Sequence, residues 1–389
     1  MVSSIKDSLY FAVNREWLNS AVVPDEYSSW GTFQELRMNT VSLMLDVVKS
    51  SHNPRIATLW GVATNRIKVN KDGLAVLRAL SKDLDALETP EDFLKAIAEL
   101  HKMGSSPIFR FGVESDFKKP LLNIGHWGQS GLGLPHRGFY MDPDKAVLRQ
   151  KYVILLEKVF GKMRHPDPGD AARRVFNLEE ELAKHHLTKE TMRDPDATYN
   201  MVKINTMSFF KPYFKHIGVT TGSINVENPK YLAFLESWSW PVDDMRLYLK
   251  WSVVRSMSTA LSDDYFELFF DFYGRTLSGQ EKLKPIEERM LRLVESCLGE
   301  ELGEEYVVML DKSGRFTEDH KTEMKELVGF LQTSLSEMIE ELDWMQPPTK
   351  KKALHKLHNI KVKIGFPDKF EDYTDLVIDP AASLVSNVI

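Results

Sequence analysis

Apolar residues recur at intervals of three and four positions along most of the chain, a spacing that places their side chains on one face of an α-helix. The clearest case runs from Thr317 to the Pro347-Pro348 pair, because proline favours the end of a helix. Its apolar positions are Met324, Leu327, Val328, Leu331, Leu335, Met338, Ile339 and Leu342. This pattern predicts a long amphipathic helix, which needs a partner to cover its apolar stripe.

Residue types that start and stop helices support two more predictions. Thr89 followed by Pro90 is typical of a helix start, and Gly104 is typical of its end. Thr349 is predicted to cap a further helix after the proline pair. Helical patterns also cover residues 36–48, 74–87, 148–160, 171–186, 243–273 and 285–301. The fold class is therefore predicted to be mainly α.

The strand signal is local. Residues 108–115 alternate between apolar and polar positions, DFKKP forms a turn, and residues 121–127 return, which predicts one small β-hairpin. Linker-like breaks lie at residues 165–170, 218–229 and 363–373. The sequence shows no internal repeat, which argues against a helical solenoid.

Composition narrows the class of protein. With 389 residues, 43% of them apolar and 27% charged, the chain is long enough for a sizeable core. The net charge of -6 is small and the basic residues are dispersed, so we expect no nucleic-acid partner. No run of 18 apolar residues occurs, so we expect no membrane segment in this chain.

Cysteine use and the first residues bear on location. The single cysteine, Cys297, excludes a disulfide framework within the chain and favours a reducing compartment. The start, MVSSIKDSLYFAVNREW, lacks the basic segment and long apolar core of a signal peptide. We expect a cytoplasmic location; the alternative is a secreted or membrane-anchored ectodomain whose leader has been removed.

The clustered histidines are the first candidates for a metal site. His355 and His358 lie three apart on a predicted helix, and both could reach one zinc ion. The zinc-peptidase arrangement instead places histidines four apart with a glutamate beside the first, and Lys356 occupies that neighbouring position. A surface or half-buried pair is the favoured interpretation. His185 and His186 are adjacent and point apart on a helix.

Three other sequence features are weaker candidates for a functional site. Residues 128–138, GQSGLGLPHRG, contain Gly-x-Gly, but a proline and no following helix pattern favour a tight loop over a nucleotide site. Cys297 shares a helix face with Val294, which indicates a buried, inert thiol. The acidic run at residues 299–305 is interpreted as a solvated helix end. The residues alone show no complete catalytic set.

A pattern near the N-terminus is known from one protein family. It consists of an aspartate, Tyr-x-x-x-Asn-x-x-Trp-Leu, a proline with an aspartate, and Gly-x-Phe-x-x-Leu-Arg. The matching residues are Asp7, Tyr10, Asn14, Trp17, Leu18, Pro24, Asp25, Gly31, Phe33, Leu36 and Arg37. Further matching blocks lie at residues 131–142, 191–202, 247–251, 272–280 and 342–368. In these ordered blocks, which span nearly the whole chain, the sequence resembles the neprilysin family of zinc metalloendopeptidases.

The resemblance implies a fold and two substrate contacts. In the family, the matching region forms a helical lobe that faces a catalytic lobe across a closed chamber and admits modest-sized peptides. Arg37 matches an arginine that meets the C-terminal end of the substrate, and Phe33 matches an aromatic residue of a side-chain pocket. A second carboxylate-binding arginine of some members falls at Ser29, and their pocket aspartate falls at Gln34.

The resemblance also predicts what this chain lacks. The family's His-Glu-x-x-His helix and third zinc ligand follow all of the matching blocks, and neither motif occurs here. We therefore expect zinc in the complete family enzyme and none bound by this chain, which alone would be non-catalytic. Its expected partners are peptide substrates and a C-terminal catalytic fragment or second chain.

The predicted organisation has three parts. Residues 1–35 would lead toward the catalytic lobe, residues 36–370 would form the helical lobe that gates the substrate, and residues 371–389 would begin a truncated catalytic lobe. The alternative is a non-catalytic peptide- or protein-binding module derived from this family. The first hypothesis predicts an exposed apolar face where the missing lobe packs, and the second predicts a covered, polar surface. The apolar end of the chain favours the first.

Overall fold

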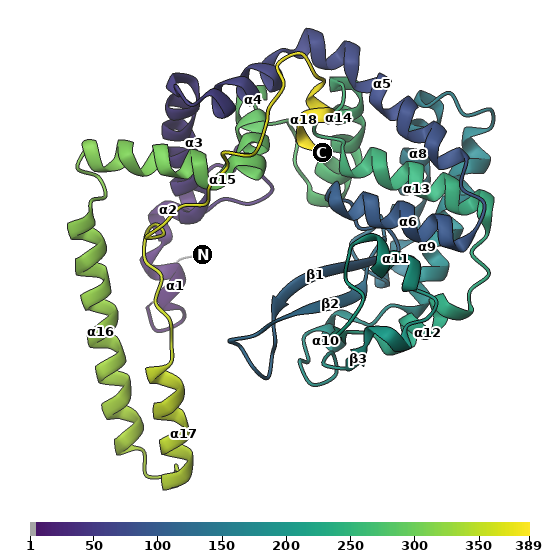
Figure 1. The fold of residues 1–389 in the computed structure, drawn as a ribbon. Helices are drawn as coiled ribbons and strands as arrows, with labels where there is room; N and C mark the ends of the chain where they lie inside the picture. Colours follow the sequence, from purple (N-terminus) through teal and green to yellow (C-terminus); the bar gives the residue numbers. More distant parts are fainter. Residues whose placement is uncertain (1–4) are drawn as a thin grey trace. The chain divides into compact units, whose positions relative to one another are not determined.

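The computed structural model describes residues 5–389, with the side-chain surroundings of all of them except Gly73 and Leu74. The chain is mainly helical and carries a small sheet (Figure 1), which confirms the predicted fold class. It divides into two compact units. The first comprises residues up to Gly31, Asn65–Lys284 and Pro380–Ile389, and the second comprises Thr32–Thr64 and Pro285–Asp379. No helix among residues 5–389 is long and apolar enough to cross a membrane.

The first unit holds most of the helices and the sheet. Its α-helices are α1 (Leu9–Val13), α2 (Arg15–Ser20), α5 (Arg66–Asp85), α6 (Pro90–Lys102), α7 (Gly138–Met141), α8 (Ala146–Lys162), α9 (Pro168–His185), α10 (Lys189–Met192), α11 (Lys211–His216), α12 (Pro229–Ser237), α13 (Val242–Ser256), α14 (Asp263–Phe269) and α18 (Leu384–Val388). Two 3-10 turns, η1 (Pro143–Lys145) and η2 (Ile204–Thr206), and a π-helix, η3 (Phe270–Leu277), complete the list. Helix α9 packs against both α8 and α13, and α13 also contacts α5.

The sheet is larger than the predicted hairpin. Strands β1 (Phe109–Ser115) and β2 (Asn123–Gln129) form that hairpin, with Phe109 opposite Gln129. Strand β4 (Ser223–Val226) runs parallel to β2, and β3 (Met201–Lys203) pairs antiparallel with β4, so the strand order is β1-β2-β4-β3. Both added strands are short, and β4 lies inside the 218–229 segment that we expected to be a linker. The turn-forming residues on either side of β4 made the whole segment look like a linker in the sequence.

The loop that contains Gly131 and Gly133 organises the core of the first unit. Tyr248 Oη donates to Gly131 O at 2.8 Å, and Tyr273 Oη donates to Gly133 O at 2.9 Å. A Cβ at Gly133 would lie 1.7 Å from Tyr152 Oη, and Gly131 has φ +93°. Both positions therefore require glycine, the first for space and the second for its backbone conformation. The predicted tight loop is confirmed.

A buried carboxylate lies directly beneath that loop. Glu179 of α9 is fully buried and accepts hydrogen bonds from Tyr140 Oη and Tyr152 Oη, each at 2.8 Å, and from Trp251 Nε1 at 3.0 Å. Burial raises the pKa of Glu179, while the charge of Arg255 and the three donors oppose that rise. The sequence pattern of α9 gave no sign of this network, because its members lie far apart along the chain.

Residues 243–273 do not form the single helix that we predicted. Helix α13 ends at Ser256, α14 begins at Asp263, and η3 continues from Phe270. The break follows from local start signals, since Ser262 and the acidic Asp263-Asp264 pair are typical of a new helix N-terminus.

The last residues of the chain also belong to the first unit, where Lys68 Nζ donates to Ala381 O at 2.7 Å.

The second unit contains five helices. They are α3 (Thr32–Ser50), α4 (Pro54–Thr64), α15 (Ile286–Lys312), α16 (Glu318–Glu341) and α17 (Pro347–His358). Helices α3 and α4 pack against α15. We expected α15 to stop at residue 301, but it continues through the acidic run to Lys312, with non-helical dihedrals at Leu298. Because Glu301 is buried against Arg55, part of that run is packed rather than solvated, which corrects our interpretation.

Helices α16 and α17 contact each other but are otherwise little covered. Thr317 caps α16 in a reciprocal box with His320. Helix α17 already begins at Pro347, so Thr349 lies inside it, and the prediction of a Thr349 cap is wrong. Proline suits the first helical position because it lacks an N–H group to satisfy. The three-part division into residues 1–35, 36–370 and 371–389 refers to lobes of a longer protein and stays a prediction.

Candidate functional site

Phe33 and Arg37, the two residues expected to meet substrate, lie one turn apart near the start of α3. Positions four apart share a face of a helix, so both side chains leave α3 on the same side. Phe33 is 84% exposed, and Arg37 is half-buried. The structure thus places the two residues together on accessible surface of the second unit, and their proposed contact with substrate stays a prediction.

Arg37 is anchored from the neighbouring helix. Its Nη2 donates to Glu295 Oε2 of α15 at 2.7 Å, with 37% of the arginine and 24% of the glutamate side chain exposed. A pair this exposed contributes little stability, because water screens the attraction. Its effect is to orient the guanidinium. This contact is the one side-chain hydrogen bond of Arg37 among residues 5–389, so four of the five guanidinium N–H groups have no protein acceptor there.

Helix α3 changes character along its length. Val41, Met44 and Val47 in its second half are buried, whereas Phe33 and Leu36 in its first half are mostly exposed. The first half therefore projects from the packed part of the unit. Sequence periodicity alone predicted the apolar face but not which half is covered, because coverage depends on where α15 passes.

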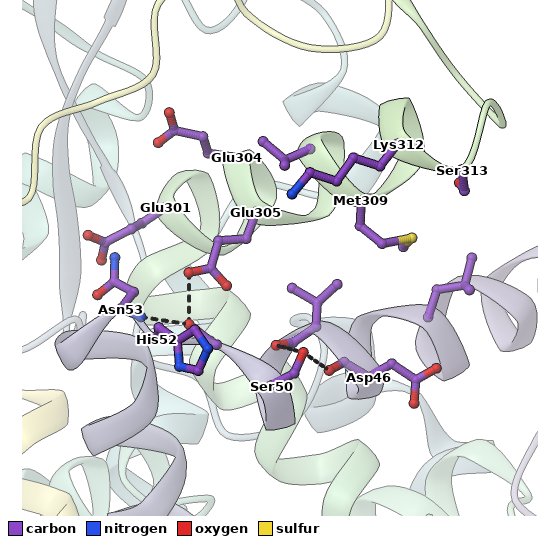
Figure 2. Close-up of a pocket in the computed structure, with 14 residues that line it drawn as sticks. Asp46, Ser50, His52, Asn53, Glu301, Glu304, Glu305, Met309, Lys312 and Ser313 are labelled. Atoms are coloured by element: carbon purple, nitrogen blue, oxygen red, sulfur yellow. Dashed lines mark hydrogen bonds between the residues drawn. The ribbon is translucent and has the colours of Figure 1, made fainter.

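A pocket of about 830 Å³ lies between the second half of α3, the loop after it and the second half of α15 (Figure 2). Its apolar lining residues are Leu43, Val47, Val308 and Met309, and its carboxylates are Asp46, Glu301, Glu304 and Glu305. Lys312 is the one lysine or arginine of the lining. The pocket therefore combines apolar walls with a negative rim, which suits a basic group better than an acidic one.

Two of the pocket carboxylates have partners within the second unit. Ser51 Oγ donates to Glu305 Oε1 at 2.8 Å. Arg55 Nε donates to Glu301 Oε1 at 3.0 Å. Burial pushes the pKa of Glu301 upward, but the Arg55 hydrogen bond and charge hold it below its usual value. These contacts join residues about 250 positions apart, and for that reason the sequence pattern did not reveal the pocket.

The candidate metal ligands do not come together. His355 and His358 are exposed on α17, and Asn359 Nδ2 donates to His355 O at 2.7 Å. Among residues 5–389, no three His, Cys, Asp or Glu side chains are placed to hold a metal ion. The described residues therefore do not form the zinc site expected of the family that the sequence resembles. We assign no zinc-dependent chemical step to them.

The other candidate groups are structural. His185 stacks on the Phe234 ring with 3.7 Å between ring centroids. His186 is buried, and burial lowers its pKa to about 4, which keeps it neutral. Cys297 is half-buried, and burial raises the pKa of its thiol, so little of the reactive thiolate forms. None of these groups has the setting of a nucleophile or an acid-base catalyst.

Comparison with known proteins adds a family match. The model for the N-terminal part of peptidase family M13 matches residues 5–367. The neutral endopeptidase of Lactobacillus helveticus is 25% identical over 409 residues, with 98% of this chain and 62% of the relative covered. Human endothelin-converting enzyme 1 is 24% identical over 392 residues, with 92% and 50% covered.

The fold comparison agrees with the sequence comparison. An inhibitor complex of a Mycobacterium tuberculosis zinc metalloprotease superposes with a TM-score of 0.90 and 27% identity. The match covers 99% of this chain and 61% of that protein. The chain therefore spans between 50 and 62% of the length of these three relatives.

Proposed function

Because the chain belongs to peptidase family M13, we propose that it supplies the N-terminal, chamber-forming part of a zinc metalloendopeptidase that hydrolyses modest-sized peptides. Further polypeptide, as a continuation of this chain or as a second chain, would carry the zinc ligands. Zinc in such a site activates a water molecule for attack on an amide. The residues described here would bind and position the peptide, and this chain alone would not cleave it.

The apolar stripe of α16 carries this proposal. Met324, Leu327, Leu331, Leu335 and Met338 follow one another at helical spacing, and their side chains are 42 to 62% exposed. An amphipathic helix is stable when its stripe packs against another element. Full burial of one large apolar side chain is worth about 1.5 to 3 kcal/mol, so a partner polypeptide on this face would gain considerable affinity.

Phe33 and Arg37 would form the substrate-facing part of the second unit. The exposed Phe33 ring can pack against an apolar side chain of a peptide. The Arg37 guanidinium, held on one side by Glu295, keeps N–H groups with which it can grip a peptide carboxylate. Ser29, which stands where some members have a second arginine, would weaken the preference for a free carboxylate nearby.

A cytoplasmic location remains part of the proposal.

A reconstitution assay tests the proposal. Peptide cleavage is measured with zinc for this chain alone and after mixing with the candidate C-terminal polypeptide from the same source. We expect cleavage only in the mixture. The Leu331→Glu variant, which puts a charge into the α16 stripe, should abolish the gain, and Thr333→Glu on another face of α16 should leave it intact.

Two outcomes would contradict the proposal in different ways. Zinc-dependent cleavage by the isolated chain would show that the metal site lies within it. If the mixture shows no gain although both polypeptides are folded, the alternative of a non-catalytic peptide- or protein-binding module is favoured. Retention of a labelled peptide by this chain, lost in Arg37→Met, would support that alternative.

A further inference from the structure

The first unit contains a cavity of about 450 Å³ that the peptidase proposal does not use. It is lined by the Gly133 loop, by the end of α13 with the turn after it, and by α14 with η3. Its volume falls within the range of small-molecule sites, which is roughly 300 to 1,000 Å³. Its walls are largely aromatic, from Phe266, Phe269, Phe270 and Tyr273.

One cationic group lies in this aromatic cavity. Arg255 of α13 lines it, and the lining contains no lysine, second arginine, aspartate or glutamate. Among residues 5–389, Arg255 forms no ion pair with a carboxylate within 4.0 Å. Arg255 is half-buried, and its charge is not neutralised by an adjacent carboxylate.

The hydrogen bonds of Arg255 leave part of its guanidinium open. Its Nη1 donates to Leu132 O, and Tyr273 Oη, which donates to Gly133 O at 2.9 Å, interacts with it as well. A guanidinium has five N–H donors. Leu132 O and Tyr273 Oη do not use all five of these donors, and Arg255 is part of the cavity lining. The remaining donors can therefore reach an acceptor in the cavity.

The cavity walls are fixed by backbone geometry. The π-helix η3 places Phe270 so that a Cβ at Gly274 would lie 2.3 Å from its ring. Only glycine tolerates this close approach. Short π-helical segments within helices are often found at functional sites. Ser258 and Thr259 add hydroxyl groups to the lining, which can donate to the same acceptor as Arg255.

We propose that this cavity binds a small organic carboxylate with an aromatic or branched apolar body, its carboxylate on Arg255 and its body against Phe269 and Phe270. The charge-assisted hydrogen bonds of an arginine fix a carboxylate in orientation. Aromatic walls exclude water around the body and stabilise it by burial. The same chemistry belongs to a free organic acid and to the C-terminal residue of a peptide.

The buried carboxyl group of Glu179 is the nearest competing charge. It interacts electrostatically with Arg255 but lies more than 4.0 Å away, and it already accepts hydrogen bonds from Tyr140, Tyr152 and Trp251. These hydrogen bonds already stabilise the negative charge of the Glu179 carboxyl group. A ligand carboxylate in direct contact with Arg255 would therefore interact with the guanidinium more strongly than Glu179 does, because attraction falls with distance.

The test is a titration by calorimetry on the full chain. The probes are 3-phenylpropionate, its amide 3-phenylpropanamide, and a tetrapeptide that ends in phenylalanine with a free carboxylate. We expect saturable binding of 3-phenylpropionate, at least about tenfold weaker binding of the amide, and a similar loss in Arg255→Met, because a hydrogen-bonded charge is removed. Arg173→Met, an exposed arginine of α9, is the matched control and should bind as the parent does.

A second variant keeps the test decisive if Arg255→Met does not fold. Thr259→Trp places a large ring at the exposed rim of the cavity and should also abolish binding. Equal binding of acid and amide, or undiminished binding in Thr259→Trp, would overturn the proposal, as would no saturable binding at millimolar concentration. Binding of the tetrapeptide together with the acid indicates a peptide-terminus site, and binding of the acid alone indicates a metabolite site. This inference does not depend on the peptidase proposal.

Discussion

The two units of the chain differ in how completely they cover their apolar side chains. In the first unit, Trp127, Trp251 and Tyr152 are fully buried, and the last two donate hydrogen bonds to the buried carboxylate of Glu179. In the second unit, Leu357 is the only apolar side chain between residues 316 and 379 that is buried. The first unit provides its own core, apart from α1 and α2, whose residues are not buried.

The difference shows two ways of holding a helical protein together. The first unit uses long-range contacts, in which phenolic hydroxyl groups satisfy backbone carbonyls of the Gly131 loop and the carboxylate of Glu179. Such contacts specify one arrangement, because each buried polar group needs its own partner. Helix α16 of the second unit instead has a local cap and packs against α17, and its apolar stripe is largely exposed.

The largest expected effect comes from removing the carboxylate at the centre of the first unit. In Glu179→Met, three buried donors from Tyr140, Tyr152 and Trp251 lose their acceptor. We expect a loss of about 3 to 5 kcal/mol in the free energy of unfolding of that unit, because breaking a buried charged network strands its partners. Urea-dependent hydrogen exchange of α9 and α13 measures it separately from the second unit.

Glu157→Gln, an exposed change on α8, is the matched control and should alter stability by less than about 0.5 kcal/mol. If Glu179→Met is equally mild, the network does not hold the unit together. The comparison between a self-sufficient and a dependent unit would then lose its main physical basis.

A smaller effect concerns two carboxyl groups whose pKa values move in opposite directions. Burial raises the pKa of Glu179, so the unfolded chain releases this proton first and the first unit loses stability as pH rises above the ordinary carboxyl value. Arg55 holds the pKa of Glu301 down, so the stability it adds to the second unit is present at higher pH and is lost as pH falls through the folded value.

These opposite slopes can be separated by mutation. Each proton contributes at most about 1.4 kcal/mol per pH unit to the slope of stability against pH. Glu179→Gln should abolish the decrease in stability of the first unit with rising pH. Glu301→Gln should abolish the increase in stability of the second unit with rising pH. Denaturant midpoints at each pH, read separately for the two units, serve as the measurement. Two slopes of the same sign would contradict the assignment.

The parts of the fold that sequence predicted are those set by local physics. The α16 periodicity involves residues within one or two turns of each other, and the long helix that it predicts is confirmed. The extension of α15 past residue 301 was missed because the burial of Glu301 depends on Arg55, 246 positions away. The same reason hides the pocket beside α15 and the Arg255 cavity, which are assembled from segments distant in sequence.

Local pattern also explains what could be said of the candidate site. The family motif singled out Phe33 and Arg37, and the structure places them on one accessible face of α3. No periodicity could have predicted that Glu295 of α15 anchors Arg37, because that contact depends on how the two helices pack. The role of both residues toward substrate stays a prediction until peptide binding is measured.

The smallest expected effect is the most informative about the second unit. Leu331 is 62% exposed on α16, so Leu331→Ala should change the free energy of unfolding of the isolated chain by less than about 0.5 kcal/mol. Leu302 of α15 is fully buried, and Leu302→Ala should cost about 2 to 5 kcal/mol by the same measurement. If a C-terminal partner covers α16, the cost of Leu331→Ala should rise only when that partner is bound. A large cost in the isolated chain would mean that α16 is already covered there, and the argument for a missing partner would fail.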